Sequence, residues 1–376
     1  FKFVWAPIID HVRLPVLSAW LGRRRGWLLL LQACLAVAIL IMGMTDPTLA
    51  PLTVAAAAVA VAFFSASQDI VIDAYRIEIL HEEEQGAGAA ATQTGYRVGL
   101  IIAGAGAIAL SDFIGWPAIF TLLAAIIVVC MVVTLLAPEP AEPARAPVAA
   151  ERRVDADRLA LLTQWIKRAV IDPFADFMGR RGWLVILAFV LLYKFGDAIG
   201  GVMTNPFYNE LGFTGVEIAS ISKVFGVIMT VVGAIAGGAL VARIGLFKAL
   251  VVGGILQAVT NLLFALLAVT GKDLTMLAVA IGADNFTGGL GSAAFVAYLS
   301  SLCNRAFTGT QYALLTSFMA AGRTMLSSGG GWLADHMDWA SFFVLTTFLA
   351  VPGLLLLFWL SRLYPAAPRA ALPERA

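Results

Sequence analysis

An apolar segment begins near Pro51, and its C-terminal part carries polar and charged side chains that could take part in binding or proton transfer. A helix that turns by about 100° per residue places four of them on one face: Ser65, Asp69, Asp73 and Arg76. A charge near the centre of a bilayer costs roughly 2.5–3.5 kcal/mol, so the two carboxylates are expected to face a protein interior or a watery cavity. They are therefore candidates for a substrate or proton pathway. The alternative is a buried ion pair that only locks helices together.

The rest of the chain supplies hydrophobic segments long enough to hold this stretch inside a membrane. Of the 376 residues, 60% are hydrophobic and 13% are charged. The apolar residues occur in blocks of about twenty, the length that crosses a bilayer. We therefore expect an all-α polytopic membrane protein with ten complete spans. The predicted spans are 27–45, 51–72, 92–110, 117–137, 183–203, 216–241, 246–270, 274–300, 310–330 and 340–361.

The positions of Lys and Arg then predict the orientation of these spans. Of the 25 basic residues, 19 fall on one side and only Lys272 falls on the other. The 19 are Arg13, Arg23, Arg24, Arg25, Arg76, Arg145, Arg152, Arg153, Arg158, Lys167, Arg168, Arg180, Arg181, Arg243, Lys248, Arg305, Arg362, Arg369 and Arg375. The positive-inside rule makes that side, with the C-terminus, cytoplasmic. With a net charge of +1, the arginines indicate topology and no nucleic-acid partner.

An acidic residue near the N-terminus precedes a tight group of arginines. We predict that Asp10 pairs with these arginines or with a helix N-terminus and so forms a cytoplasmic clasp. Plain positive-inside anchoring is the alternative for the arginines alone. A similar helix–loop–helix segment in the second half suggests that the clasp recurs there. The predicted gating residues are Asp10, Arg23, Arg24, Arg25, Arg243 and Lys248.

Several other polar residues lie within the predicted spans. Gln93, Tyr96 and Arg97 share one helix face, and Arg97 is the expected counter-charge for Asp69 or Asp73. The second half adds Lys194 and Asp197 at i and i+3, Asp284 and Asn285 within a glycine-rich span, and Arg323. We predict that this set lines the substrate or proton pathway. The glycines by themselves are better explained by close helix packing.

The sequence gives no sign of catalytic or metal chemistry. The three cysteines are far apart and suggest neither a disulfide framework nor a metal site: Cys34, Cys130 and Cys303. The three histidines fall in predicted loops on different sides: His11, His81 and His336. No nucleophile–base spacing and no phosphate-binding glycine loop is visible. We therefore expect neither an enzyme nor a cofactor, and a non-transporting receptor stays open as an alternative.

Echoes between the two halves indicate an internal duplication. Ala74-Tyr75 matches Ala297-Tyr298, Arg97 matches Arg323, and Asp112–Trp116 matches Asp335–Trp339, about 223 to 226 residues apart. We predict four segments along the chain. These are an incomplete N-terminal bundle (1–137), a cytoplasmic linker with an interfacial helix (138–181), a C-terminal six-helix bundle (182–362) and a cytoplasmic tail (363–376). If both halves have six spans, the first helix and most of the second are absent from this chain.

Two homologous halves, a cytoplasmic linker and paired clasps resemble the major facilitator superfamily. Segments 2–10, 22–27 and 67–75 look like the AmpG branch, the muropeptide permeases. His11 departs from the basic residue expected after Asp10. The resemblance implies two six-helix bundles with pseudo-two-fold symmetry that rock about a central site.

The same resemblance implies a function. It suggests import of anhydro-muropeptides, which are breakdown products of peptidoglycan, from periplasm to cytoplasm across the bacterial inner membrane. The proton gradient would drive this import without a cofactor, and one of Asp69 and Asp73 would carry the proton, balanced by Arg97. We expect a monomer with a small glycopeptide substrate, whose import feeds β-lactamase induction in some bacteria. A related facilitator for an acyl-CoA, a peptide or a siderophore stays open.

Overall fold

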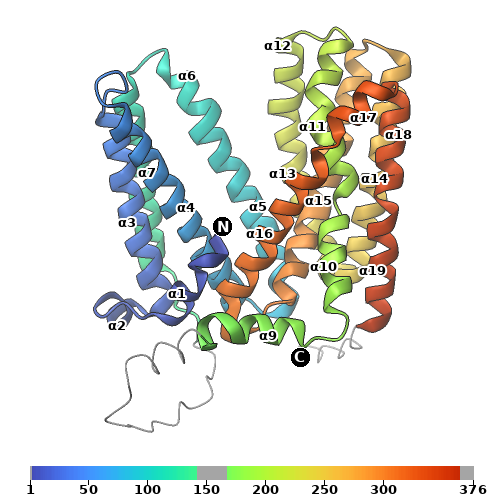
Figure 1. The fold of residues 1–376 in the computed structure, drawn as a ribbon. Helices are drawn as coiled ribbons and strands as arrows, with labels where there is room; N and C mark the ends of the chain where they lie inside the picture. Colours follow the sequence, from blue (N-terminus) through green and yellow to red (C-terminus); the bar gives the residue numbers. More distant parts are fainter. Residues whose placement is uncertain (1, 142–166, 365–376) are drawn as a thin grey trace, which may run out of the picture. The chain divides into compact units, whose positions relative to one another are not determined.

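The computed structural model describes residues 2–141 and 167–364, and the elements in these ranges are helices (Figure 1). The chain divides into two compact units. Unit 1 contains Phe1–Phe177 and Phe295–Phe318, and unit 2 contains Met178–Ala294 and Met319–Ala376. The first turns of α16 therefore belong to unit 1, although they lie in the second half of the sequence. Parts of the predicted linker and tail lie outside the described residues.

Unit 1 is built from the helices that begin the chain, together with the ends of two later ones. Its elements are η1 (Lys2–Val4), α1 (Ala6–His11), α2 (Leu17–Leu21), α3 (Arg23–Met44), α4 (Pro51–Ile79), η2 (Glu82–Glu84), α5 (Gln85–Leu100), η3 (Ile101–Gly106), α6 (Ala107–Ser111), α7 (Trp116–Leu136), η4 (Lys167–Ile171), most of α9 (Asp172–Met178) and η6 (Arg305–Phe307). The end of α15 and the start of α16 complete it.

Unit 2 holds most of the second sequence half. Its elements are α10 (Trp183–Leu192), α11 (Phe195–Glu210), α12 (Gly215–Ile218), η5 (Ala219–Phe225), α13 (Gly226–Ile244), α14 (Leu246–Thr270), α15 (Leu274–Ser301), the end of α16 (Thr308–Ser327), α17 (Gly330–His336), α18 (Trp339–Leu349) and α19 (Val351–Leu363). Part of its core is aromatic. The ring of Phe343 stacks on Phe264 at a centroid distance of 5.2 Å and meets Phe207 in a T-shaped contact at 4.9 Å.

Length and hydropathy identify eight helical segments in the described part of the chain as able to cross a membrane. The pair 274–301 and 305–336, which bends by 96°, raises the number to nine if it counts as one span. We had predicted ten, with this pair as two separate spans. The second member carries Gln311, Thr316, Ser317 and Arg323, which lower its hydropathy. The other eight predicted spans coincide with the observed ones to within a few turns.

Helix starts in the two sequence halves repeat with a constant offset. Four pairs of starts each lie 223 positions apart: Arg23 and Leu246, Pro51 and Leu274, Gln85 and Thr308, Trp116 and Trp339. The backbone repeats as well, since Gly22 and Gly245 both have φ of 86° just before their helices. A φ in this region costs glycine nothing and strains other residues. The predicted internal repeat is therefore visible in the backbone.

One predicted span is broken near its middle. Residues 183–203 were expected to form one helix, but α10 ends at Leu192 and α11 begins at Phe195. Lys194 at the break has φ of −111° and ψ of 22°, outside the helical region. Non-helical backbone at membrane depth is tolerated where it is buried in protein or lines a water-filled cavity. The break therefore places Lys194 where its ammonium can serve a polar site.

Close contact between α13 and α15 holds unit 2 together. A Cβ atom on Gly233 would lie 1.9 Å from the carbonyl oxygen of Phe286, and one on Gly289 would lie 2.2 Å from that of Thr230. Only glycine permits such an approach, because a Cβ at these distances would overlap backbone that cannot move aside. The glycines that we assigned to helix packing thus have that role here.

We predict that Gly233→Ala lowers the free energy of unfolding by roughly 1–3 kcal/mol or more, because it overpacks the α13–α15 contact. The measurement is the thermal unfolding midpoint of the purified protein in detergent. Gly201→Ala is the matched control, since a Cβ at this α11 position meets nothing within 4 Å. Equal midpoints for the two variants would refute the packing role of Gly233.

Candidate functional site

A buried ion-pair network lies at the arginine-rich end of unit 1. Arg24 donates to the Asp10 carboxylate at 2.8 Å and to the two oxygens of Glu78 at 2.5 and 2.9 Å. Arg23 donates to the backbone oxygen of Asp10 and lies 3.5 Å from Glu78. All four side chains are at most 9% exposed. The network joins α1, α3 and α4, and it matches the pairing that we predicted for Asp10.

Asp10 also binds the N-terminus of α16. Its Oδ2 accepts from the backbone N–H of Thr310 at 2.6 Å and from the Thr310 hydroxyl at 2.7 Å, and its Oδ1 accepts from Gly309 N–H at 3.3 Å. A Cβ on Gly309 would lie 2.7 Å from Oδ1, so a larger residue would displace the carboxylate. The positive end of the helix dipole favours a carboxylate there. One side chain thus joins the two sequence repeats.

The pKa of Asp10 reflects these partners. Complete burial by itself would raise it, but Arg24, the Thr310 hydroxyl and Arg23 together hold the pKa of Asp10 below its ordinary value of 3.8. The carboxylate is therefore ionised throughout the physiological pH range. A charge fixed in this way can hold α1 and α16 together without competition from protons.

Two acidic residues that the sequence analysis did not select belong to the same network. Glu78 lies at the end of α4, and Glu139 follows α7. Glu139 accepts from the backbone N–H groups of Arg24 at 2.7 Å and of Arg25 at 3.0 Å, so it caps α3. The available signal was the excess of arginines in segment 23–25, since three buried or half-buried cations need more acid than Asp10 provides.

The second predicted clasp repeats in its backbone, and the role of Arg243 and Lys248 in gating stays a prediction. Arg243 and Lys248 are exposed, whereas Arg23 and Arg24 are buried. The positions 223 residues after Arg24 and Glu78 hold Phe247 and Ser301, so this half lacks the acid and the arginine that would form a buried pair.

A second charged cluster lies deeper along α4. Asp73 is 3.9 Å from the Lys2 ammonium and 3.8 Å from the Arg76 guanidinium. The Arg76 guanidinium lies over the ring of Tyr312 at 5.6 Å, so the cluster also touches α16. Arg76 is 6% exposed, and its Nε and one terminal nitrogen have no hydrogen-bond partner in the described residues. This cluster joins α4, η1 and α16 through charged side chains.

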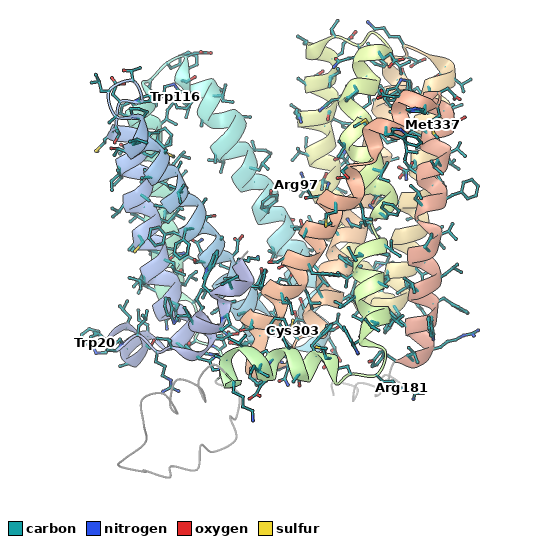
Figure 2. The ribbon with its side chains drawn as sticks, viewed as in Figure 1. Trp20, Arg97, Trp116, Arg181, Cys303 and Met337 are labelled. Carbon is teal, nitrogen blue, oxygen red and sulfur yellow. The ribbon has the colours of Figure 1, made fainter. Side chains whose placement is uncertain are left out.

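Arg97 is not the counter-charge of this cluster, contrary to our prediction. Lys2 and Arg76 occupy that role for Asp73. Arg97 is half-buried on α5, and its Nε has no hydrogen-bond partner among the described residues (Figure 2). Lys2 was overlooked because it lies in the short η1 helix, and the chain must fold back to bring η1 against α4. Asp69 is exposed.

The two other predicted residues of α5 do not join the pairing either. Gln93 is half-buried, and Tyr96 is 62% exposed. No hydrogen bond links either side chain to Asp69 or Asp73 in the described part of unit 1. Their place on the pathway stays a prediction.

Unit 2 gathers the polar residues predicted for the second half. Lys194 donates to the Ser292 hydroxyl at 2.5 Å, and Gln257 donates to the Asp197 carboxylate. The charges of Lys194 and Arg323 act on Asp197. Gln257 and Ser292 were absent from the predicted set. Gln257 fits because Gly291 has no Cβ, which would lie 2.5 Å from its oxygen.

The remaining members of this set lie on neighbouring elements of unit 2. Asn285 accepts from the Thr230 hydroxyl at 2.9 Å and donates to its own helix at the Ile281 oxygen. Asp284 is half-buried, and Arg323 is exposed. Lys194, Asp197 and Asp284 act on one another electrostatically, so the structure brings these three charges together.

An apolar groove of about 530 Å³ lies between α3 and α4 in unit 1. It is lined by Ala33, Cys34, Val37, Ala38, Ile41, Thr53, Ala56, Ala57, Ala60 and Phe64. Such a lining offers almost nothing to the amides, hydroxyls and charges of a polar solute. No group of three or more potential metal ligands occurs in the described ranges 2–141 and 167–364. The charged cluster of each unit is therefore a separate candidate for solute contact.

Comparison with known proteins identifies the fold and the relatives. The sequence pattern of the Major Facilitator Superfamily matches residues 1–323 and 185–376. The chain resembles the solved proton:xylose symporter XylE, with a TM-score of 0.65, 14% identity, and coverage of 95% of this chain and 84% of that one. It also resembles the E. coli fucose:proton symporter FucP, with a TM-score of 0.67, 12% identity, and coverage of 96% and 88%. These likenesses confirm the predicted fold.

Other known proteins share much higher sequence identity with this chain than these solved structures do. The chain is 41% identical to the anhydromuropeptide permease of Escherichia coli K12 over 359 residues, which cover 95% of this chain and 69% of that protein. It is 35% identical over 363 residues to the putative transporter AmpG 4 of Rickettsia felis, covering 96% and 85%. The resemblance to the AmpG branch that the motifs predicted is therefore confirmed.

We predict that Arg24→Met destabilises the protein by roughly 3–5 kcal/mol, because it leaves Asp10 and Glu78 buried without their shared counter-charge. The thermal midpoint in detergent measures the effect. Lys248→Met is the control at an exposed basic residue, with an expected change within about 0.5 kcal/mol. A midpoint for Arg24→Met equal to that of the control would show that the buried network adds no stability.

Acid should weaken the Asp10 contact in a defined window. Because the folded protein holds the pKa of Asp10 below 3.8, its contribution to stability is complete above the unfolded pKa and disappears as pH falls through the folded one. We therefore expect the stability gap between the natural protein and Asp10→Asn to be constant from pH 5 to 8 and to shrink below pH 4, both approximate limits. A gap that shrinks near neutral pH would contradict this assignment.

Proposed function

The chain belongs to the major facilitator superfamily, and on that premise we propose that it is a permease that imports anhydro-muropeptides. The observation that carries this proposal is the 41% identity to the E. coli anhydromuropeptide permease across 95% of the chain. Identity spread over the whole length includes the helices that hold both charged clusters. This coverage supports a solute class shared with that relative.

The polar groups of the two units suit such a solute. A muropeptide combines sugar hydroxyls, amides, carboxylates and often an amine. Unit 1 offers Lys2, Asp73 and Arg76, and unit 2 offers Lys194 and Asp197 with amide and hydroxyl side chains nearby. Charged residues inside membrane spans are costly, and they mark substrate and ion pathways. Charges of both signs occur together within each unit, and this supports a zwitterionic glycopeptide over a purely apolar solute.

We further propose that the protein lies in a bacterial inner membrane with its arginine-rich end in the cytoplasm, and that it works as a monomer without a cofactor. The excess of basic residues on one side supports this orientation. In the proposed cycle the clasp of Asp10, Arg24 and Glu78 closes the cytoplasmic end. Release of Asp10 from the first turn of α16 would accompany its opening. The proton gradient would supply the energy, with a membrane aspartate as carrier.

Two other functions are weighed against this one. A related facilitator could carry an acyl-CoA, a peptide or a siderophore, and an exchange assay separates these solutes directly. Proteoliposomes containing the intact protein would take up labelled anhydro-muropeptide, and unlabelled candidates would compete. Competition by an acyl-CoA or a siderophore, with none by muropeptide, would overturn the proposed substrate. Binding of muropeptide without flux would indicate a receptor.

We predict that Asp73→Asn lowers muropeptide uptake by about tenfold or more, because it removes the charge that Lys2 and Arg76 share at membrane depth. Uptake is measured in cells and normalised to the amount of protein in the membrane. Asp46→Asn is the control, since this carboxylate lies outside the spans and bonds only Thr48 nearby. Unimpaired, proton-dependent uptake by Asp73→Asn would remove this residue from the mechanism.

A further inference from the structure

The start of α16 is held from a second direction by α9, the helix near the end of the predicted linker. Gln311, which is 1% exposed, follows Thr310 in the first turn of α16. Its amide donates to the Asp176 carboxylate of α9 at 2.8 Å and to the Pro173 carbonyl oxygen at 3.0 Å. The same carboxylate accepts from the side-chain amide of Asn304 at 3.0 Å. α9 is therefore bonded to both ends of segment 304–311, which contains η6 and the first turn of α16.

Hydrogen bonds within this segment join its two ends. The backbone N–H of Asn304 donates to the side-chain oxygen of Gln311 at 2.7 Å. The hydroxyl of Thr308, which is fully buried, donates to the Asn304 carbonyl oxygen at 3.4 Å. Gln311 thus uses its oxygen inside the segment and its nitrogen toward α9. A side chain bonded on both sides in this way limits how far the helix turn that carries it can rotate.

The turn that Gln311 fixes is also the turn that binds Asp10. The N–H groups of Gly309 and Thr310 donate to the Asp10 carboxylate at 3.3 and 2.6 Å. Helix ends fray, and a hydrogen bond weakens steeply when its donor turns away from the acceptor. Support from α9 on the adjacent residue therefore keeps both N–H groups directed at Asp10.

The helical turn before α9 contacts the other partner of this interaction. η4 packs against α1, the helix that carries Asp10, and Ala169 within η4 is fully buried. In α9 itself, Phe177 is only 3% exposed. The two short helices at 167–178 therefore contact both α1 and the start of α16, and they lie where they can hold the two together.

We propose that Asp176 and Gln311 are positioning residues of the cytoplasmic clasp, and that through α9 they hold the first turn of α16 in the orientation that Asp10 binds. This inference rests on the clasp of the permease proposed above, and it gives α9 a part in closing that end. Without the Asp176 carboxylate the first turn of α16 can move, so the closed state of the clasp becomes less populated.

The test measures opening of this end in membrane vesicles that expose the cytoplasmic side, without any solute. Cys303 is half-buried and adjacent to Asn304, so its reaction with a membrane-impermeant maleimide reports movement of segment 304–311 (Figure 2). The parent is the intact protein with Cys303 as its only cysteine. We expect Asp176→Asn to speed this labelling about fivefold or more, because hydrogen bonds to a charged group are lost. Glu83→Gln, at an exposed acid of η2, is the control and should label like the parent.

A second substitution separates positioning from general loosening of the protein. Thr310→Val removes the hydroxyl that donates to Asp10 at 2.7 Å. If α9 acts through this contact, Thr310→Val should speed labelling about fivefold in the parent and less than about twofold in Asp176→Asn, since coupled residues have non-additive effects. General loosening predicts the same factor in both backgrounds.

The outcomes are distinct from those that test the permease. Labelling needs no solute, so absence of muropeptide transport would refute the permease while the labelling rates still decide the role of Asp176. Equal rates for Asp176→Asn and the parent, or equal factors for Thr310→Val in the two backgrounds, would overturn the positioning role. Asp176→Glu keeps the carboxylate and should label more slowly than Asp176→Asn. Equally fast labelling of these two variants would also count against the proposal, because the carboxylate would then not be what holds the turn.

Discussion

An ionised side chain removed from water must find a counter-charge or a hydrogen-bond donor, and this requirement organises the described parts of both units. At the arginine-rich end, Arg24 compensates Asp10 and Glu78 together, and Asp10 in turn holds the first turn of α16. Removing any one of these residues leaves another buried charge without its partner, so the residues of the network depend on one another. Such a network has two states, formed and broken.

The internal repeat shows which features duplication preserves. Helix starts recur 223 residues apart, and Gly22 and Gly245 share the same backbone angles. Two charges of the clasp do not recur, because Phe247 occupies the position that corresponds to Arg24 and Ser301 the one that corresponds to Glu78. Backbone geometry is retained because every helix must still pack against its neighbours. Charges can diverge, because each was needed for one task. The two halves therefore share an architecture while dividing the chemistry between them.

The carboxylates at membrane depth extend this division. Asp73 and Asp197 are surrounded by cations or donors, and they can serve as fixed charges for a zwitterionic solute. Glycines make the arrangement possible, since Gly291 leaves room for Gln257 beside Asp197. Glycines thus allow close helix packing and also leave room for polar side chains such as Gln257.

The sequence by itself determined the membrane class, the approximate helices, the offset of the repeat and the family, because these depend on hydrophobic periodicity and on local motifs. It also identified Asp10 and its arginines, since an acid followed by three arginines leaves few other partners. Only the tertiary structure decided which charges meet. Lys2 replaced Arg97 beside Asp73, Glu78 and Glu139 joined the clasp, and Arg243 and Lys248 stayed exposed. The pairing of charged side chains depends on how each helix is rotated and on distances between residues remote in sequence. The residue pattern of a single helix determines neither.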